Sequence, residues 1–183
     1  MRWESLFEDF EAQLASAARL DAESEVSERV RAEQGALGMA ERLRGHGQRP
    51  VDLLLRGGVR LRGRLAQLAE AWLVLEEGPQ SALVPLAGIV TVSGLGRAAR
   101  EEGSAVRRKL SLASGLRALA RDRALVTCVV DAGRGEPLLV AGTLDTVGRD
   151  YAEVANRSDE WGRGPAGTVV VPFAALIAVR SGM

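Results

Sequence analysis

The stretch GRLAQLAEAWLVL, residues 63–75, aligns without a gap with GTLDTVGRDYAEV, residues 142–154. In this alignment the first glycines coincide, Leu65 meets Leu144, and an aromatic residue meets an aromatic residue at the tenth position. A shared glycine beside regularly spaced apolar residues is typical of a strand with a close backbone approach and one buried face. The two stretches therefore predict that one arrangement of strands occurs twice along the chain.

A second pair of stretches supports the same repeat. LVPLAGIVTV, residues 83–92, matches VVPFAALIAV, residues 170–179, and the proline is kept. Upstream, Val51, Leu53 and Leu55 are spaced like the buried face of a strand, and two glycines then mark a tight turn. The pattern predicts two small antiparallel β-barrels, each built from four or five short strands.

The expected division of the chain follows from these stretches. Apolar residues spaced three and four apart predict helices before the first barrel and between the barrels. We expect an α+β protein with N-terminal helices and two internally repeated small antiparallel β-barrels, each preceded by a helix. The expected parts are a helical segment at 1–47, a first barrel at 48–96, a basic helical connector at 97–124 and a second barrel at 125–183.

A helix followed by a five-stranded barrel, with a glycine midway along the second strand, resembles the Sm-like family of SH3-like small barrels. The resemblance covers residues 26–95 and again 106–181. It implies edge strands that pair with other barrels, either within the chain or between chains, and hence a homo-oligomer. The matching residues are Gly57, Gly63, Leu65, Leu68, Val84, Ile89, Val92, Val171, Leu176 and Val179.

The residues with which Sm-like proteins grip uridine-rich RNA do not occur at the matching positions. The family has an aspartate and an asparagine after the bent strand, and an arginine and a glycine in its second motif. The resemblance therefore implies the shape of the barrel without the family's RNA pocket. The residues at these positions are Ala69, Leu73, Gly148 and Ala152 for the first pair, and Pro85, Leu86, Pro172 and Phe173 for the second.

Composition limits the classes of function. The 183 residues carry 24 basic and 24 acidic side chains, so the chain lacks the basic excess of proteins that coat nucleic acid. All the basic residues except Lys109 are arginines, which fits the codon bias of a high-GC bacterial genome. Cys128 lies in an apolar run and is expected to be buried. No stretch resembles a signal peptide or a membrane span, so we expect a cytoplasmic protein without membrane contact.

No group of residues predicts catalysis. One histidine, one cysteine and no paired acid motif give no nucleophile with a base and no metal site, so we expect no enzyme and no cofactor. His46, between two glycines, is expected to be a solvated linker residue. GLGRAA, residues 94–99, fits the dinucleotide-binding pattern, but Asp131 lies 37 residues on, where that pattern needs an acid after about 20. A turn between barrel and helix is the preferred interpretation.

Two functions remain open from the sequence. The first is a protein-interaction or assembly module that binds a protein partner or a second copy, with candidate interface residues Trp3, Phe7, Phe10 and Trp161. The second is an RNA- or DNA-binding regulator, with candidate residues Arg60, Arg62 and Arg64 on one strand and Arg107, Arg108 and Lys109 in the connector.

The zero net charge favours the protein-interaction module, whereas the eight basic and three acidic residues of the connector keep nucleic acid open. Trp161 either anchors an interface or folds back over the end of the barrel. The acidic N-terminal helices either pack on the basic connector or face solvent.

Overall fold

The computed structural model describes residues 16, 19, 24–32, 34–133, 135–156 and 167–181. The chain forms two compact units, residues 1–38 and residues 39–183. In the first unit the described residues 24–32 and 34–36 are helical, and Arg29 Nη2 lies 3.0 Å from Glu25 Oε1 one turn away. No helix among the described residues is long and apolar enough to cross a membrane.

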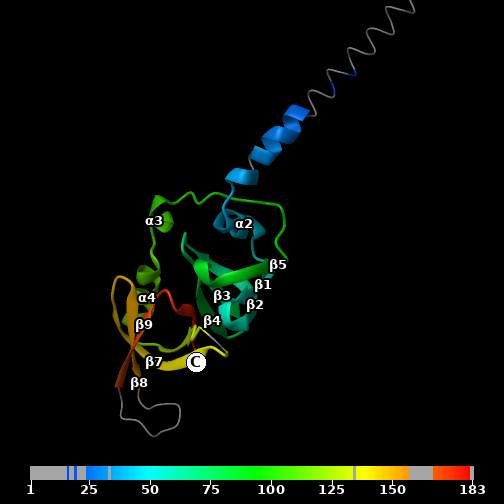
Figure 1. Ribbon diagram of the computed structural model, residues 1–183. Coiled ribbons are helices and arrows are strands. Elements are labelled where there is room, and N and C mark those ends of the chain that lie inside the picture. The colour runs from blue at the N-terminus through cyan, green and yellow to red at the C-terminus, as the bar shows by residue number, and fades with distance from the viewer. Residues whose placement is uncertain are drawn as a thin grey trace, which may run out of the picture. The chain divides into compact units, whose positions relative to one another are not determined.

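The described residues of the second unit form ten strands in one antiparallel sheet (Figure 1). Their order across the sheet is β5-β1-β2-β3-β4-β10-β6-β7-β8-β9. The strands are β1 (Pro50–Leu55), β2 (Arg60–Leu68), β3 (Trp72–Glu77), β4 (Gln80–Pro85), β5 (Ile89–Ser93), β6 (Leu125–Val130), β7 (Leu138–Val147), β8 (Tyr151–Asn156), β9 (Gly167–Pro172) and β10 (Leu176–Ser181). Short helices accompany them: α2 (Met39–His46), η1 (Arg56–Gly58), η2 (Leu86–Gly88), α3 (Ala105–Arg108) and α4 (Leu112–Arg121).

The expected mixture of a few helices with antiparallel strands is confirmed, but strand pairing does not close the sheet into barrels. The sheet has two ends, β5 and β9. The physical reason is that β4 takes β10 as its second neighbour, so β1 to β5 continue directly into β6 to β10. We call these the first and the second set of strands.

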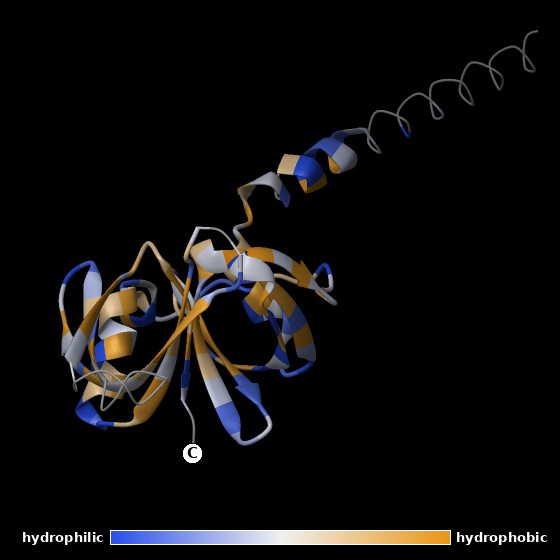
Figure 2. Ribbon diagram, turned by 60° about the horizontal axis from the view of Figure 1, so that its bottom comes forward, coloured by the Kyte–Doolittle hydropathy of each residue, from blue (hydrophilic) through white to orange (hydrophobic). Residues whose placement is uncertain are grey.

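Alternation along β1 and β2 creates the first buried face, as predicted. Every second residue of β1 is buried, and on β2 Leu61 and Leu65 are buried while the arginines between them are exposed. The turn between the strands needs two left-handed residues, because φ is +67° at Gly57 and +74° at Gly58. Figure 2 shows the resulting change between hydrophobic and hydrophilic residues along the strands.

Gly63 and Gly142 lie in β2 and β7, where a neighbouring strand comes very close. A Cβ atom on Gly63 would lie 2.1 Å from the carbonyl oxygen of Glu76 on β3. A Cβ atom on Gly142 would lie 2.4 Å from the carbonyl oxygen of Ala155 on β8. Both obstacles are backbone atoms of a paired strand, so no side-chain rotation relieves the contact.

Each of the two hydrophobic cores contains residues from both sets of strands. Consequently each core depends on both sets. The first core consists of Leu43, Val51, Leu53, Leu55, Leu61, Leu65, Leu73, Leu75, Ala82 and Val84, together with Val129, Ile177 and Ala178 of the second set. The second consists of Leu116, Val126, Cys128, Val140, Leu144, Ala152, Val154, Val171, Leu176 and Val179, together with Ala69, Trp72 and Leu83 of the first set.

The connector contains two short helices and not one continuous helix. Ser104 and Ser111 each cap a helix, since their side chains accept a hydrogen bond from a backbone N–H three residues on. α4 packs on the first set through Gly115, where a Cβ atom would lie 3.1 Å from the Trp72 ring. The indole Nε1 of Trp72 donates to the carbonyl oxygen of Ser111 at 2.9 Å. This aromatic side chain therefore fixes the start of α4.

We predict that Gly63→Ala and Gly142→Ala each lower the free energy of unfolding by about 1–3 kcal/mol, because the new methyl group forces two paired strands apart. Gly103→Ala is the matched control, since a Cβ atom there meets nothing within 4 Å. Urea unfolding followed by circular dichroism measures all three variants. Equal stability of Gly63→Ala and Gly103→Ala would show that the strands do not approach this closely.

Candidate functional site

The seam between β4 and β10 joins the two sets of strands. It combines a backbone ladder with a side-chain contact, because the Oγ atoms of Ser81 and Ser181 lie 2.7 Å apart and share a hydrogen bond. The seam therefore fixes both the register and the relative direction of the two strands. The paired residues are Val179 with Leu83, Arg180 with Ala82, and Ser181 with Ser81.

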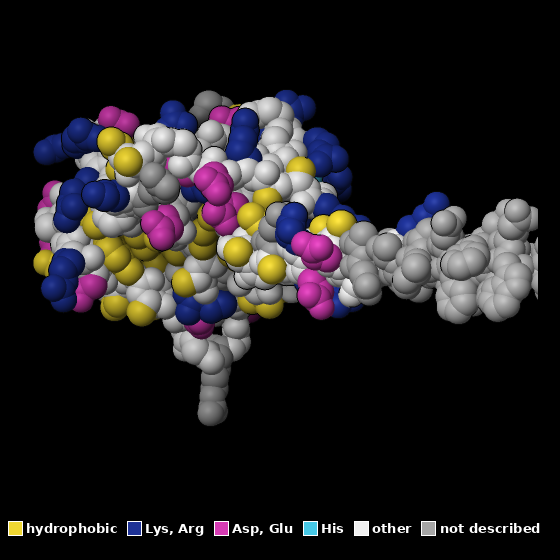
Figure 3. All heavy atoms as spheres, turned by 90° about the horizontal axis from the view of Figure 1, so that it is seen from above, with side chains coloured by type: hydrophobic (Ala, Val, Ile, Leu, Met, Phe, Trp, Pro, Cys, Tyr) yellow, Lys and Arg dark blue, Asp and Glu magenta, His cyan; other side chains and the backbone are white. Residues whose placement is uncertain are grey.

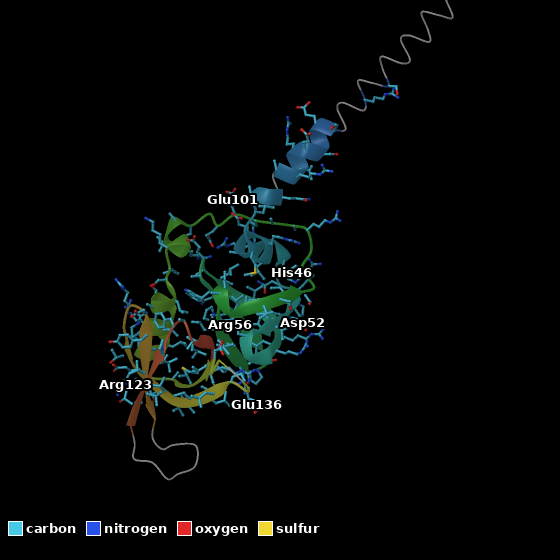
Figure 4. The ribbon with its side chains drawn as sticks, viewed as in Figure 1. His46, Asp52, Arg56, Glu101, Arg123 and Glu136 are labelled. Carbon is cyan, nitrogen blue, oxygen red and sulfur yellow. The ribbon has the colours of Figure 1, made fainter. Side chains whose placement is uncertain are left out.

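Arg56 spans the seam from the end of β1, and is labelled in Figure 4. Its Nη2 donates to the carbonyl oxygens of Ala174 at 3.1 Å and Leu176 at 3.3 Å. Its Nη1 lies 3.8 Å from Oδ2 of Asp131, at the end of β6. Because the guanidinium group carries several donors in one plane, this side chain connects the first set to two elements of the second.

The ends of the sheet, β5 and β9, are exposed and carry no charged residue. β5 reads IVTVS and β9 reads GTVVVP. Val90 of β5 is 57% exposed, and Val170 of β9 is 56% exposed. Soluble proteins commonly protect edge strands with charged side chains, interior prolines or a covering element. The absence of charge from these two edges makes them the candidate interface.

The predicted arginine row lies where the sequence places it. Arg60, Arg62 and Arg64 are exposed on one face of β2. The Nε of Arg62 lies 3.6 Å from Oδ1 of Asp52 on β1, and both side chains are more than half exposed. Arg60 and Arg62 line a cavity of about 280 Å³ that also contains Asp52 and Glu77. The charge at this face is therefore mixed.

The other predicted basic residues do not join this row. Arg107 and Lys109 are exposed in the connector, and Arg107 lines a different cavity that shares no residue with the first. Figure 3 shows Lys and Arg side chains in several separate places on the visible face. The side chain of Arg108 lies outside the described part of the chain, as do Trp3, Phe7, Phe10 and Trp161. The interface role of these four aromatic residues stays a prediction.

A larger cavity of about 760 Å³ lies among α2, the end of β2 and the start of the connector. One wall holds Arg44 and Glu102, whose Nε and Oε2 atoms are 3.3 Å apart and whose side chains are 12% and 11% exposed. The backbone N–H of Ser104 donates to Oε1 of Glu102 at 2.9 Å. Sequence reasoning missed this pair, because nothing in the order of residues indicates that Glu102 meets α2. The ion pair joins the connector to α2.

Residues 94–104 cross α2 before α3 begins. A Cβ atom on Gly45 would lie 2.3 Å from the carbonyl oxygen of Ala98, so the crossing requires glycine in α2. The GLGRAA motif lies in this segment and is followed by no helix before Ala105, which fits the turn that we expected. Two hydrogen bonds fix the segment, from Arg42 Nη2 to Gly96 O at 2.9 Å and from Arg100 N to Glu41 O at 3.0 Å.

Among the described residues, two titratable side chains outside the larger cavity are buried. Cys128 is buried on β6 as predicted, and burial raises the pKa of its thiol to about 11. The prediction for His46 is wrong, because this side chain is only 5% exposed. α2 extends to His46, and the ring Nε2 lies 3.3 Å from the carbonyl oxygen of Pro50 at the start of β1. The described residues contain no group of three His, Cys, Asp or Glu side chains that could hold a metal ion.

Comparison of the chain with protein-family models, curated proteins and solved structures finds no match.

We predict that Glu102→Gln lowers the free energy of unfolding by about 2–3 kcal/mol, since it removes the carboxylate that faces the largely buried guanidinium of Arg44. Asp52→Asn is the matched control, because its ion pair with Arg62 is exposed and contributes less than about 1 kcal/mol. Urea unfolding compares the two variants. A loss for Glu102→Gln no larger than that of the control would contradict the stabilising role of the buried pair.

Proposed function

We propose that the unit of residues 39–183 is a non-enzymatic assembly module that adds further β-strands at its two sheet edges. The observation that carries the proposal is the pair of exposed, uncharged edge strands, β5 and β9. A strand added to such an edge gains main-chain hydrogen bonds along its length, and exposed valines give it apolar contacts. The expected partner is therefore a protein that presents an extended, apolar strand.

We also propose that the two sets of strands are a duplicated small barrel of the Sm-like kind. Matching irregularities of pairing support this. On β2 the register with β3 shifts between Leu65 and Gln67, and on β7 the register with β8 shifts between Leu144 and Thr146. These positions correspond in the alignment that brings Gly63 onto Gly142. On this proposal, the seam is already one example of two barrels joined through edge strands.

The proposed function predicts that the full chain associates reversibly, and that Thr91→Lys combined with Val170→Lys abolishes the association. A lysine in the middle of each edge strand opposes strand addition, because it introduces charge and must be desolvated. Static light scattering over a concentration series measures the mass. The mass should rise above 19.4 kDa for the natural chain and remain at 19.4 kDa, the mass of the monomer, for the double variant.

Ala141→Lys is the control, since residue 141 is exposed on β7, an interior strand of the sheet. This variant should associate like the natural chain. A natural chain that remains monomeric up to its solubility limit, or a double variant that associates as the natural chain does, would refute the proposed function.

Nucleic-acid binding is the second candidate, and the exposed row of Arg60, Arg62 and Arg64 is the observation that favours it. Three guanidinium groups at every second residue of one strand present a line of phosphate-binding groups to solvent. The carboxylates of Asp52 and Glu77 in the same cavity and the zero net charge weigh against it.

This candidate predicts binding of mixed RNA or duplex DNA that weakens steeply with salt and is lost when all three arginines are changed to glutamate. Fluorescence anisotropy at two salt concentrations measures it, and Arg107→Glu with Arg108→Glu tests the connector separately. Undetectable binding at low salt would remove the candidate.

A further inference from the structure

We infer that the strand partner is a second copy of this chain, joined head to tail, with β9 of one copy antiparallel to β5 of the next. The inference rests on the proposed function and gives that function a partner and a direction. Its basis is the seam, where one edge of the first set is already paired with one edge of the second.

The free edge β9 has the same local connections as β4, the strand on one side of the seam. β4 ends at Pro85, which pairs with Trp72 of the preceding strand, and β9 ends at Pro172, which pairs with Tyr151. In both strands, the residue that follows the proline donates its backbone N–H to a carbonyl oxygen of the preceding strand. The acceptor is the residue just before Trp72 or Tyr151. These bonds run from Leu86 to Ala71 at 2.9 Å and from Phe173 to Asp150 at 2.8 Å.

The free edge β5 in turn matches β10, the strand on the other side of the seam. β5 carries a one-residue bulge at Val90 against β1, and β10 carries one at Ile177 against β6. The bulge does not prevent a further strand from pairing, because β10 pairs with β4 beyond its own bulge, from Val179 to Ser181. Up to Ser93, a β5 edge therefore presents to a β9 edge the backbone arrangement that β10 presents to β4 within the chain.

Transferring the register of the seam gives the register of the joint between copies. Val170, which is 56% exposed in the single chain, would lie against Val92, and the pairing would add main-chain hydrogen bonds on both sides. Association of β9 with another β9 has no counterpart among the pairings of the described strands. The predicted pairs are Val170 with Val92 and Val169 with Ser93, in the same antiparallel direction as the pairs of the seam. The third pair of the seam has no extended counterpart, because β5 ends at Ser93 and φ is +86° at Gly94.

The joint between copies is weaker than the seam, because two seam contacts have no equivalent there. Thr168 and Gly94 stand where Ser81 and Ser181 share a hydrogen bond in the seam. Asp131 directly follows β6, at the position that corresponds to Arg56 after β1. In the seam Arg56 donates hydrogen bonds to two carbonyl oxygens, and a carboxylate at the corresponding position cannot donate such bonds. We therefore expect association to be dissociable and dependent on concentration.

Variants with one blocked edge test the direction of the joint. Thr91→Lys blocks β5 and Val170→Lys blocks β9, and circular dichroism with thermal unfolding checks that each variant folds. The inference predicts that each variant alone is monomeric by light scattering. An equimolar mixture then forms a one-to-one dimer, because one variant supplies a free β9 and the other a free β5.

A dimer formed by either variant alone, or a mixture that stays monomeric, would overturn the head-to-tail joint. The proposed function survives that result if the natural chain associates and the double variant does not. If the double variant associates as the natural chain does, both proposals fail.

Disulfide trapping tests the register independently. Opposed residues in antiparallel strands have Cβ atoms about 4.5–5.5 Å apart, close to the spacing that a disulfide requires. A Val170→Cys chain oxidised with a Val92→Cys chain should give a covalent dimer, whereas Val90→Cys, two residues away and in the bulge, should give far less. Equal trapping by the two partners would contradict the register.

Discussion

The backbone pairing of β4 with β10 is the constraint on which the rest of the second unit depends. It converts two sets of five strands into one sheet, and it places side chains of each set in the hydrophobic core of the other. Each set spans only about 45–60 residues, a size at which a single core gives marginal stability, so the shared cores have a clear physical reason. Arg56 reinforces the seam from the side with hydrogen bonds to Ala174 and Leu176.

The same constraint explains the distribution of exposed surface. Because the seam uses one edge of each set, each set is left with one free edge, and both free edges are apolar and uncharged. An exposed edge of this kind normally attracts further strands, and natural proteins usually suppress it. An edge used for ordered assembly needs no such suppression. This reasoning favours assembly over nucleic-acid binding, since the arginines of β2 share their cavity with carboxylates. The outer edges of β5 and β9, in contrast, pair with no further strand among the described residues.

Local patterns in the sequence predicted the strands and turns, whereas long-range contacts escaped them. The spacing of Val51, Leu53 and Leu55, the glycine turn and the burial of Cys128 follow from period-2 alternation and composition, which neighbouring residues determine. The choice of β10 as the neighbour of β4 joins residues about 100 positions apart, and alternation alone does not specify which edges meet. The pairing of Arg44 with Glu102 and the burial of His46 also depend on how the connector and α2 pack, which their local sequence does not indicate.

Native-state hydrogen exchange tests most directly whether the seam unites the two sets. If it does, one global opening should expose the slowest-exchanging amides of both sets. The amides of β2, β7 and the seam strands β4 and β10 should then show the same free energy of opening and the same dependence on denaturant concentration. Exchange of the β4 and β10 amides at a much lower free energy, with β2 and β7 then opening independently, would contradict this. Such a result would mean that the two sets fold separately.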